Sequence, residues 1–118
     1  IEPTVVFADN GGGVEWQEAN EQQQLDSIRE VAENFENVNL WWIDAGWYPC
    51  RGKDGKRDWT LTGSWYPDPE RFPNGLAPIG KACDEAGMDL LVWFEPERIR
   101  PGLKLAVEHP EWKTCCST

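Results

Sequence analysis

The chain has 118 residues, enough for one domain of ordinary size. It is 40% hydrophobic and 27% charged and holds no apolar run long enough to cross a bilayer, as expected of a globular protein. The net charge of −10 argues against nucleic acid, because phosphates need cations to neutralise them, and equally against an anionic membrane surface. Composition therefore leaves neither nucleic acid nor membrane as an expected partner.

Tryptophan is the unusual component, at 8 of 118 residues. An indole ring offers a flat apolar face with one polar edge, which suits flat ligands such as sugar rings, although burial in a core is the alternative. The four cysteines show no zinc spacing and no disulfide framework: Cys115 and Cys116 are adjacent, Cys83 lies in a helical pattern and Cys50 in a loop. We expect no metal and no organic cofactor, and a reducing compartment such as the cytoplasm is slightly favoured.

The first part of the chain predicts a strand, a helix and a second strand. Residues 5–7 form a short β-type run that stops at the breaker 9–13. A helix is predicted from Asn20, which with Gln23 resembles a capping box. Residues 38–47 are a nearly continuous apolar run, typical of a parallel strand buried on both faces. The apolar positions at helical spacing are Leu25, Ile28, Ala32 and Phe35.

A loop, a helix and a strand are predicted next. Residues 48–73 carry proline and glycine without periodicity, which predicts a long loop with a small hairpin turning at Asp54-Gly55. Apolar spacing predicts a helix over residues 76–86, closed by Gly87 just beyond its C-terminus. Residues 88–94 then predict another strand of the buried type.

A third helix is expected from Leu103 to His109, and Pro110 ends it. The order is thus β-α-β-loop-α-β-α, and βα alternation without a glycine-rich phosphate loop favours a barrel over a dinucleotide-binding fold. A closed (β/α)₈ barrel takes roughly 200 residues or more. The predicted fold class is therefore α/β, a partial TIM-type barrel of about three βα units, whose open edges invite self-association.

Functional residues of such barrels lie at the C-terminal ends of the strands. Asp44 is the only charge within residues 38–47 and stands near the end of that strand, before Gly46. Burying an unpaired carboxylate is costly, so Asp44 either pairs with an arginine or lysine or faces a polar ligand. Its position favours the ligand.

The next strand ends in Trp93-Phe94-Glu95-Pro96-Glu97. Strand alternation places Trp93 and Glu95 on one face, a ring beside a carboxylate, which a sugar site requires. The alternative for Glu95 is an ion pair with Arg98 or Arg100. Most glycosidases use two carboxyl groups flanking the scissile bond, and spacing alone makes Asp44 and Glu95 the candidate pair. The same alternation predicts that Leu91 shares the face of Trp93, and that the opposite face carries Leu90, Val92 and Phe94.

At these residues the sequence resembles glycoside hydrolase family 36, the melibiases, which are retaining α-galactosidases with a (β/α)₈ catalytic barrel. Order and spacing agree over residues 38–112, and much less before residue 38. The matching stretches are Trp42-Ile43-Asp44-Ala45-Gly46-Trp47-Tyr48, Trp65 to Leu76, Ala86-Gly87-Met88, Trp93 to Glu97, and Glu108-His109-Pro110-Glu111-Trp112.

The resemblance implies that residues 1–118 are the N-terminal portion of such a barrel. It implies that Asp44 binds galactose hydroxyls, that Trp93 lines the same subsite and that Trp65 lies near it. Trp47 and Glu95 complete the expected substrate-binding set. The family's nucleophile and acid/base are aspartates on later strands, so no catalytic residue is expected within this chain, and this outweighs the pair chosen from spacing.

The leading functional hypothesis is a fragment of a retaining α-galactosidase that cleaves terminal α-linked galactosides and is inactive by itself. A non-catalytic carbohydrate-binding fragment is one alternative. Another is a related α-glycosidase, such as an α-N-acetylgalactosaminidase, because Ala45 replaces the second aspartate of the family's Asp-Asp-Gly-Trp motif. The partner in the leading case is an α-galactoside oligosaccharide.

Overall fold

The structure is a computed structural model, and it describes residues 4–8 and 18–112. Three parallel strands, β1 (Val6–Ala8), β2 (Leu40–Ile43) and β3 (Asp89–Val92), form one sheet in the order β1-β2-β3. Two helices connect them, α1 (Glu21–Asn34) between β1 and β2, and α2 (Ala77–Glu85) between β2 and β3. The predicted order of elements is confirmed. The predicted breaker at residues 9–13 lies outside the described residues.

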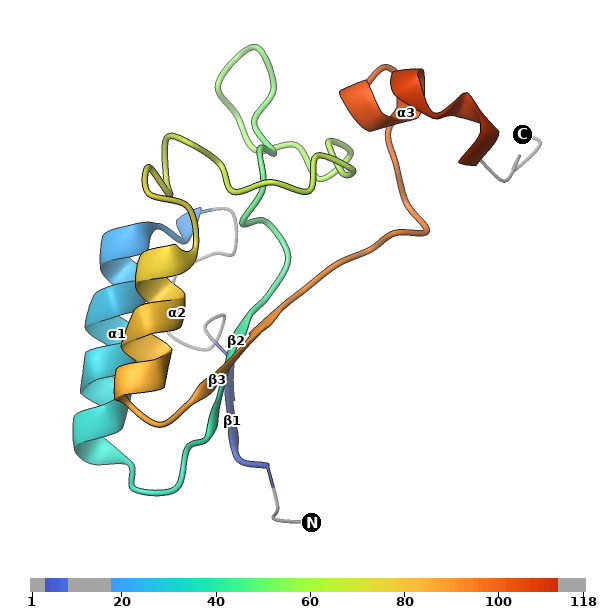
Figure 1. Cartoon of the computed structure of the whole chain (residues 1–118). Coiled ribbons are helices and arrows are strands. Elements are labelled where there is room, and N and C mark those ends of the chain that lie inside the picture. The colour runs from blue at the N-terminus through green and yellow to red at the C-terminus, as the bar shows by residue number, and fades with distance from the viewer. Residues whose placement is uncertain (1–3, 9–17, 113–118) are drawn as a thin grey trace.

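Helices α1 and α2 lie side by side on one face of the sheet (Figure 1). Their apolar sides pack on the β2 side chains Trp41 and Ile43, which are 0% and 1% exposed. On the neighbouring strand, Leu90 and Val92 pack partly buried against the same core. The other buried members of this core include Ile28, Val31, Phe72, Ile79, Cys83 and Met88.

The start of α1 agrees with the prediction, whereas its buried face differs. The Asn20 side chain accepts the Gln23 backbone N–H at 3.0 Å, which satisfies one donor of the first turn. Ala32 and Phe35 are exposed, although they share the apolar spacing of Leu25 and Ile28. The buried positions of α1 are Gln24, Ile28 and Val31. Gln24 is buried because its side-chain amide oxygen accepts the indole N–H of Trp41 at 2.8 Å.

The strands are shorter than their apolar runs. Strand β2 covers Leu40–Ile43 of the predicted 38–47, since the Asp44 side chain binds the next backbone N–H and Gly46 turns the chain at φ 97°. The predicted hairpin at Asp54-Gly55 is confirmed by an isolated antiparallel bridge between Arg51 and Arg57.

Beyond β3 the chain runs away from the α1–α2 layer to α3 (Lys104–Glu108), as Figure 1 shows. The third predicted helix is thus confirmed and ends before Pro110, and a separate 3₁₀ turn, η3, spans Pro110–Trp112. Among the described residues, no helix is long and apolar enough to cross a membrane.

The sheet face opposite α1 and α2 is apolar and open among the described residues. Val6, Leu91 and Trp93 are 43%, 37% and 36% exposed there, while the alternate residues of β2 are buried. Among the described residues, one face of the sheet is open and the outer edges of β1 and β3 are unpaired, as in a segment of a larger barrel.

Candidate functional site

The carboxyl ends of β2 and β3 lie next to each other and are joined by two hydrogen bonds. The Trp93 backbone N–H donates to the Ile43 carbonyl at 2.9 Å, which continues the parallel ladder one residue past β3. The indole N–H of Trp47 donates to the Trp93 carbonyl, also at 2.9 Å. Asp44 and Trp93, predicted from separate motifs, are therefore brought to one edge of the sheet.

Asp44 is half-buried at this edge, and its Oδ1 accepts the Ala45 backbone N–H at 2.7 Å. A carboxylate has about four acceptor sites, so Asp44 can accept more than this one bond. Ala45 itself is 6% exposed, and its methyl group packs inward. Asp44 is thus held at the strand end by its own backbone bond, where it can meet the hydroxyls of a ligand.

Trp93 forms the aromatic wall of this edge. Its ring stacks on that of Trp42 with centroids 6.4 Å apart and planes inclined by 16°, and it stays 36% exposed. Leu91 and Trp93 are exposed whereas Leu90 and Val92 are half-buried, which confirms the predicted alternation as far as Trp93. Phe94, predicted on the side of Leu90 and Val92, is 54% exposed because it lies beyond the end of β3. A partly exposed indole beside a carboxylate is suited to a sugar ring, whose C–H face packs on the indole while its hydroxyls reach the acid.

A cluster of aromatic rings supports this edge from the loop side. Trp47 and Tyr48 are buried, and Trp65 packs on both with ring centroids 6.4 Å and 5.0 Å away. Phe94 completes the cluster, 5.3 Å from Trp47 and 5.4 Å from Trp65. The structure therefore brings Trp47 and Trp65 to the strand end that carries Trp93, with Trp47 inside the cluster and Trp65 on its outer side.

Glu95 is occupied by an ion pair. Both of its carboxylate oxygens accept from the guanidinium of Arg98 at 2.8 Å, which is the alternative stated for Glu95 from the sequence. These bonds lower the pKa of Glu95 below its ordinary value. Glu95 is therefore ionised at neutral pH and is an acceptor of hydrogen bonds rather than a proton donor.

Arg71 is the functional-site residue that sequence reasoning missed. Its guanidinium is buried and donates to the carbonyls of Gly46 and Tyr48 at 2.7 Å and 2.9 Å, and to that of Ala19 at 3.0 Å. It also pairs with the buried carboxylate of Asp68 at 3.3 Å. Arg71 thus fixes the turn that follows Asp44 and carries Trp47. The sequence signal that could have indicated this role is an arginine three residues after an aspartate in a proline-rich loop.

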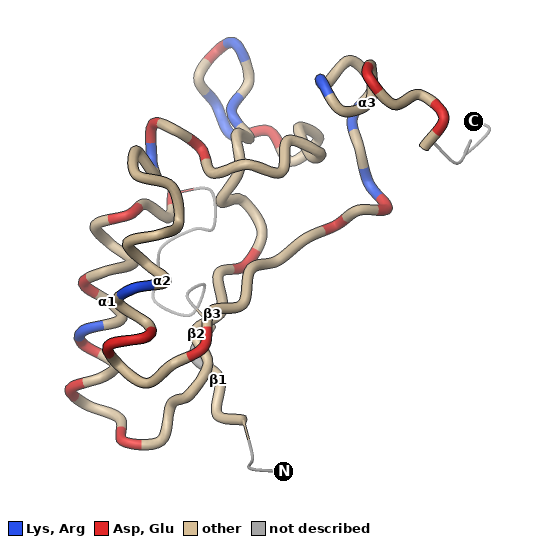
Figure 2. Tube along the Cα trace, viewed as in Figure 1, with Lys and Arg blue, Asp and Glu red and all other residues tan. Residues whose placement is uncertain are grey.

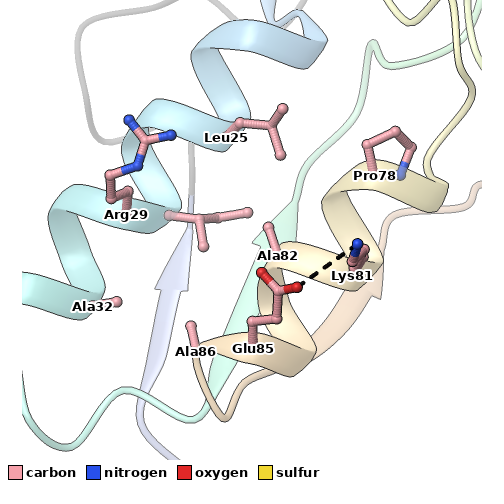
Figure 3. A pocket seen from close by; sticks show the side chains of 9 residues that line it. Leu25, Arg29, Ala32, Pro78, Lys81, Ala82, Glu85 and Ala86 are labelled. Carbon is pink, nitrogen blue, oxygen red and sulfur yellow. Dashed lines mark ion pairs between the residues drawn. The ribbon is translucent and has the colours of Figure 1, made fainter.

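Other features of the chain do not form a site of the same kind. Figure 3 shows a surface groove of about 440 Å³ between α1 and α2, lined by Leu25 and Arg29 on one side and by the ion pair of Lys81 and Glu85 on the other. It lies between the helices and away from the strand ends. Acidic residues are spread along α1 and the loops (Figure 2).

Among the described residues, neither the cysteines nor the metal-ligating side chains form a further reactive or metal-binding site. Burial raises the pKa of the Cys83 thiol to about 11 and raises that of Cys50 as well, so both are protonated at neutral pH and are poor nucleophiles. Within residues 4–8 and 18–112, no three His, Cys, Asp or Glu side chains are grouped so that they could hold a metal ion.

Comparison with known proteins points to a single family. The family model described as Melibiase matches residues 14–117. The alpha-galactosidase of Escherichia coli is 36% identical over 89 residues, which are 74% of this chain and 12% of that protein. The probable alpha-galactosidase G of Aspergillus terreus is 42% identical over 84 residues, 64% of this chain and 11% of that protein. The chain thus spans 11–12% of the length of these two relatives.

Solved structures agree. A variant of a GH36 alpha-galactosidase from Geobacillus stearothermophilus in complex with raffinose superimposes with a TM-score of 0.72 and 27% identity, covering 94% of this chain and 14% of that one. Another variant of that enzyme, in complex with stachyose, has the same TM-score, identity and coverage.

Replacing Arg71 by Met is expected to destabilise the protein, because it leaves the buried Asp68 carboxylate without its cation and removes the guanidinium donor of three carbonyls. The expected loss in the free energy of unfolding is about 3–5 kcal/mol. The measurement is chemical denaturation followed by tryptophan fluorescence. Arg29→Met is the control, because Arg29 forms an exposed ion pair with Asp26 on α1, and such pairs contribute about 1 kcal/mol or less. Equal shifts for the two variants would contradict the role given to Arg71.

Proposed function

Because the chain belongs to the melibiase family, we propose that it forms the opening part of the catalytic barrel of an α-galactosidase. In this proposal residues 1–118 supply three successive βα units of a (β/α)₈ barrel, with α1 and α2 on its outer side. The open face of the sheet then becomes the barrel interior. The enzyme that contains this chain hydrolyses terminal α-linked galactosides.

One observation carries the proposal: Asp44 and Trp93 stand at the carboxyl ends of neighbouring parallel strands, where barrel enzymes bind substrate. The interior role of the open face has separate support. The Trp42 indole N–H is buried without a hydrogen-bond partner among the described residues, and an unsatisfied buried donor is costly. An acceptor from further barrel strands or from substrate would satisfy it.

The proposed roles follow from the chemistry of each side chain. Asp44 accepts hydrogen bonds from galactose hydroxyls, and Trp93 packs against the apolar face of the sugar ring. Trp47 holds the two strand ends together through the Trp93 carbonyl, and Trp65 extends the aromatic wall outward. Glu95, paired with Arg98, contributes an acceptor at the edge of the site.

None of these residues is proposed to perform the bond cleavage. Retaining glycosidases need a nucleophilic carboxylate and a second carboxyl group that first donates and then accepts a proton, about 5–5.5 Å apart. The acid/base must begin protonated, whereas the Arg98 pair lowers the pKa of Glu95. The two catalytic aspartates are accordingly proposed to come from parts of the barrel outside this chain.

Removing either proposed substrate contact is expected to lower kcat/KM for an aryl α-galactoside. A charged acceptor bonded to a hydroxyl contributes about 1.5–3 kcal/mol, so Asp44→Ala should reduce kcat/KM at least roughly tenfold in the intact enzyme. Trp93→Ala should do the same through lost packing. Because neither residue transfers a proton, the pH profile should keep its shape.

The matched controls are Asp26→Ala on α1 and Phe35→Ala at the residue that follows α1, both exposed, which should leave kcat/KM unchanged. Full activity of Asp44→Ala would make Asp44 a structural carboxylate and would overturn its assignment. An altered pH profile would instead return Asp44 to the set of proton-transferring candidates.

A second candidate, an α-glycosidase with another preferred sugar, rests on Ala45. The missing carboxylate removes one hydroxyl contact of the family's galactose subsite, so restoring it with Ala45→Asp should raise the ratio of kcat/KM for galactosides over that for N-acetylgalactosaminides. Ala45→Asn, of equal size but uncharged, separates the effect of charge from that of volume, which matters because Ala45 is 6% exposed. An unchanged or lowered ratio for Ala45→Asp would remove the basis of the second candidate.

The 118-residue polypeptide alone is expected to associate with itself and to hydrolyse no α-galactoside. Its outer strands and its apolar sheet face are uncovered among the described residues, and such edges pair with other chains. Analytical ultracentrifugation should show concentration-dependent association. Leu91→Lys, which charges the open face, should weaken that association, and Phe35→Lys, just beyond α1, should not. A monodisperse monomer, or turnover of an aryl galactoside, would contradict the partial-barrel assignment.

A further inference from the structure

The backbone of Trp93 is held more firmly than its ring. The Trp93 N–H donates to the Ile43 carbonyl, and the Trp93 carbonyl accepts the Trp47 indole N–H, both at 2.9 Å. The ring stacks on Trp42 with centroids 6.4 Å apart and is 36% exposed. An indole with one open side can occupy more than one rotamer. The orientation of the Trp93 ring therefore depends on a further side-chain contact.

Glu95 supplies this contact. The Trp93 indole N–H donates to the Glu95 carboxylate, and this bond lowers the pKa of Glu95 in addition to the larger effect of Arg98. The Glu95 side chain is 14% exposed, so its carboxylate lies largely enclosed by protein. Where the carboxylate of Glu95 is held therefore decides how the ring of Trp93 is turned.

Arg98 holds the Glu95 carboxylate through both of its oxygens. Its Nε donates to Oε2 and its Nη2 to Oε1, each at 2.8 Å. The remaining nitrogen, Nη1, donates to the Trp59 carbonyl at 3.0 Å. The planar fork of a guanidinium matches the two oxygens of a carboxylate, whereas an ammonium group does not. Arg98 thus fixes the carboxylate after β3 relative to the loop that follows β2.

The neighbouring Arg100 shows that this role belongs to one particular arginine. The guanidinium of Arg100 binds the same loop but pairs with Asp58, at 3.2 Å. The two arginine side chains are similarly exposed, 47% for Arg98 and 42% for Arg100. Exposed ion pairs contribute little to the free energy of unfolding. What distinguishes Arg98 is therefore its contact with the carboxylate that binds the Trp93 indole.

We propose that Arg98 is a positioning residue of the candidate site, which holds the Glu95 carboxylate against the indole N–H of Trp93 and thereby keeps the ring turned to pack on a sugar. Arg98 acts through Glu95 and contacts no reacting atom. The proposal rests on the proposed function, because it takes packing of a terminal galactose on Trp93 as given.

The test is a double-mutant cycle in the intact enzyme with p-nitrophenyl α-galactoside. Arg98→Met should raise KM roughly three- to tenfold, within the range of coupling between residues in contact. It should leave kcat unchanged, because the ring packs on the sugar equally in the ground state and in the transition state. In the Trp93→Ala background, Arg98→Met should cause no further rise in KM, since the ring that it positions is absent.

Three variants serve as controls. Arg98→Lys keeps the charge but not the fork, so its KM should lie between those of the wild type and Arg98→Met. Arg100→Met removes the matched arginine and should leave KM unchanged. Glu95→Gln keeps the shape of the side chain and weakens the pair from the other side. It should raise KM in the presence of Trp93 and not in its absence, and it replaces Arg98→Met in the cycle if that variant does not fold.

The outcomes separate this proposal from the proposed function. If the wild type does not cleave the aryl galactoside, the proposed function fails and the role of Arg98 fails with it. If the wild type is active but Arg98→Met leaves KM unchanged, or raises it by the same factor with and without Trp93, the positioning role is overturned while the function stands. A rise in KM that disappears in Trp93→Ala and is absent in Arg100→Met supports the role.

Discussion

The guanidinium of Arg71 connects three parts of the chain that are distant in sequence. It donates to the Ala19 carbonyl before α1, to the Gly46 and Tyr48 carbonyls after β2, and to Asp68 in its own loop. Buried main-chain carbonyls need donors, and in an irregular turn no strand partner supplies them. A single side chain with five N–H groups in a planar fork can satisfy several carbonyls at once. The position of Trp47, and through it the junction of the two strand ends, depends on this arrangement.

The two faces of the sheet differ in burial and therefore in how much they stabilise the fold. One face buries Trp41 and Ile43 completely under two helices, which gives the three strands a core of their own. The other face exposes Val6 and Leu91, and the Trp42 indole N–H is buried there without a hydrogen-bond partner among the described residues. Hydrophobic burial scales with area, so the helix-covered face provides most of the stabilisation among the described residues, whereas the open face contributes less.

The sequence predicted the order of elements because that order depends on patterns within single segments. The cap at Asn20 and the glycine after α2 are local signals, and both are found where expected. The errors arise where partners distant in sequence decide. Gln24 rather than Ala32 or Phe35 is buried on α1 because Trp41 presents an indole N–H to it. The ion pair of Glu95 with Arg98 was one of two alternatives left open. The contacts of Arg71 could not be read from spacing, since they connect residues 23 to 52 positions apart.

The residues of the candidate site are held in two ways, some at strand ends and others in a loop. Asp44 and Trp93 stand at the ends of hydrogen-bonded strands, so their separation is set by the sheet and tolerates little change. Trp65 and Tyr66 belong to a loop held by the contact of Gly63 with Ile99 and by the Arg100 bond to Thr62. Loops accept substitution and insertion more readily than strands do. Asp44 and Trp93 therefore lie in the rigid part of the fold, whereas Trp65 and Tyr66 lie where the chain can vary without disturbing the sheet.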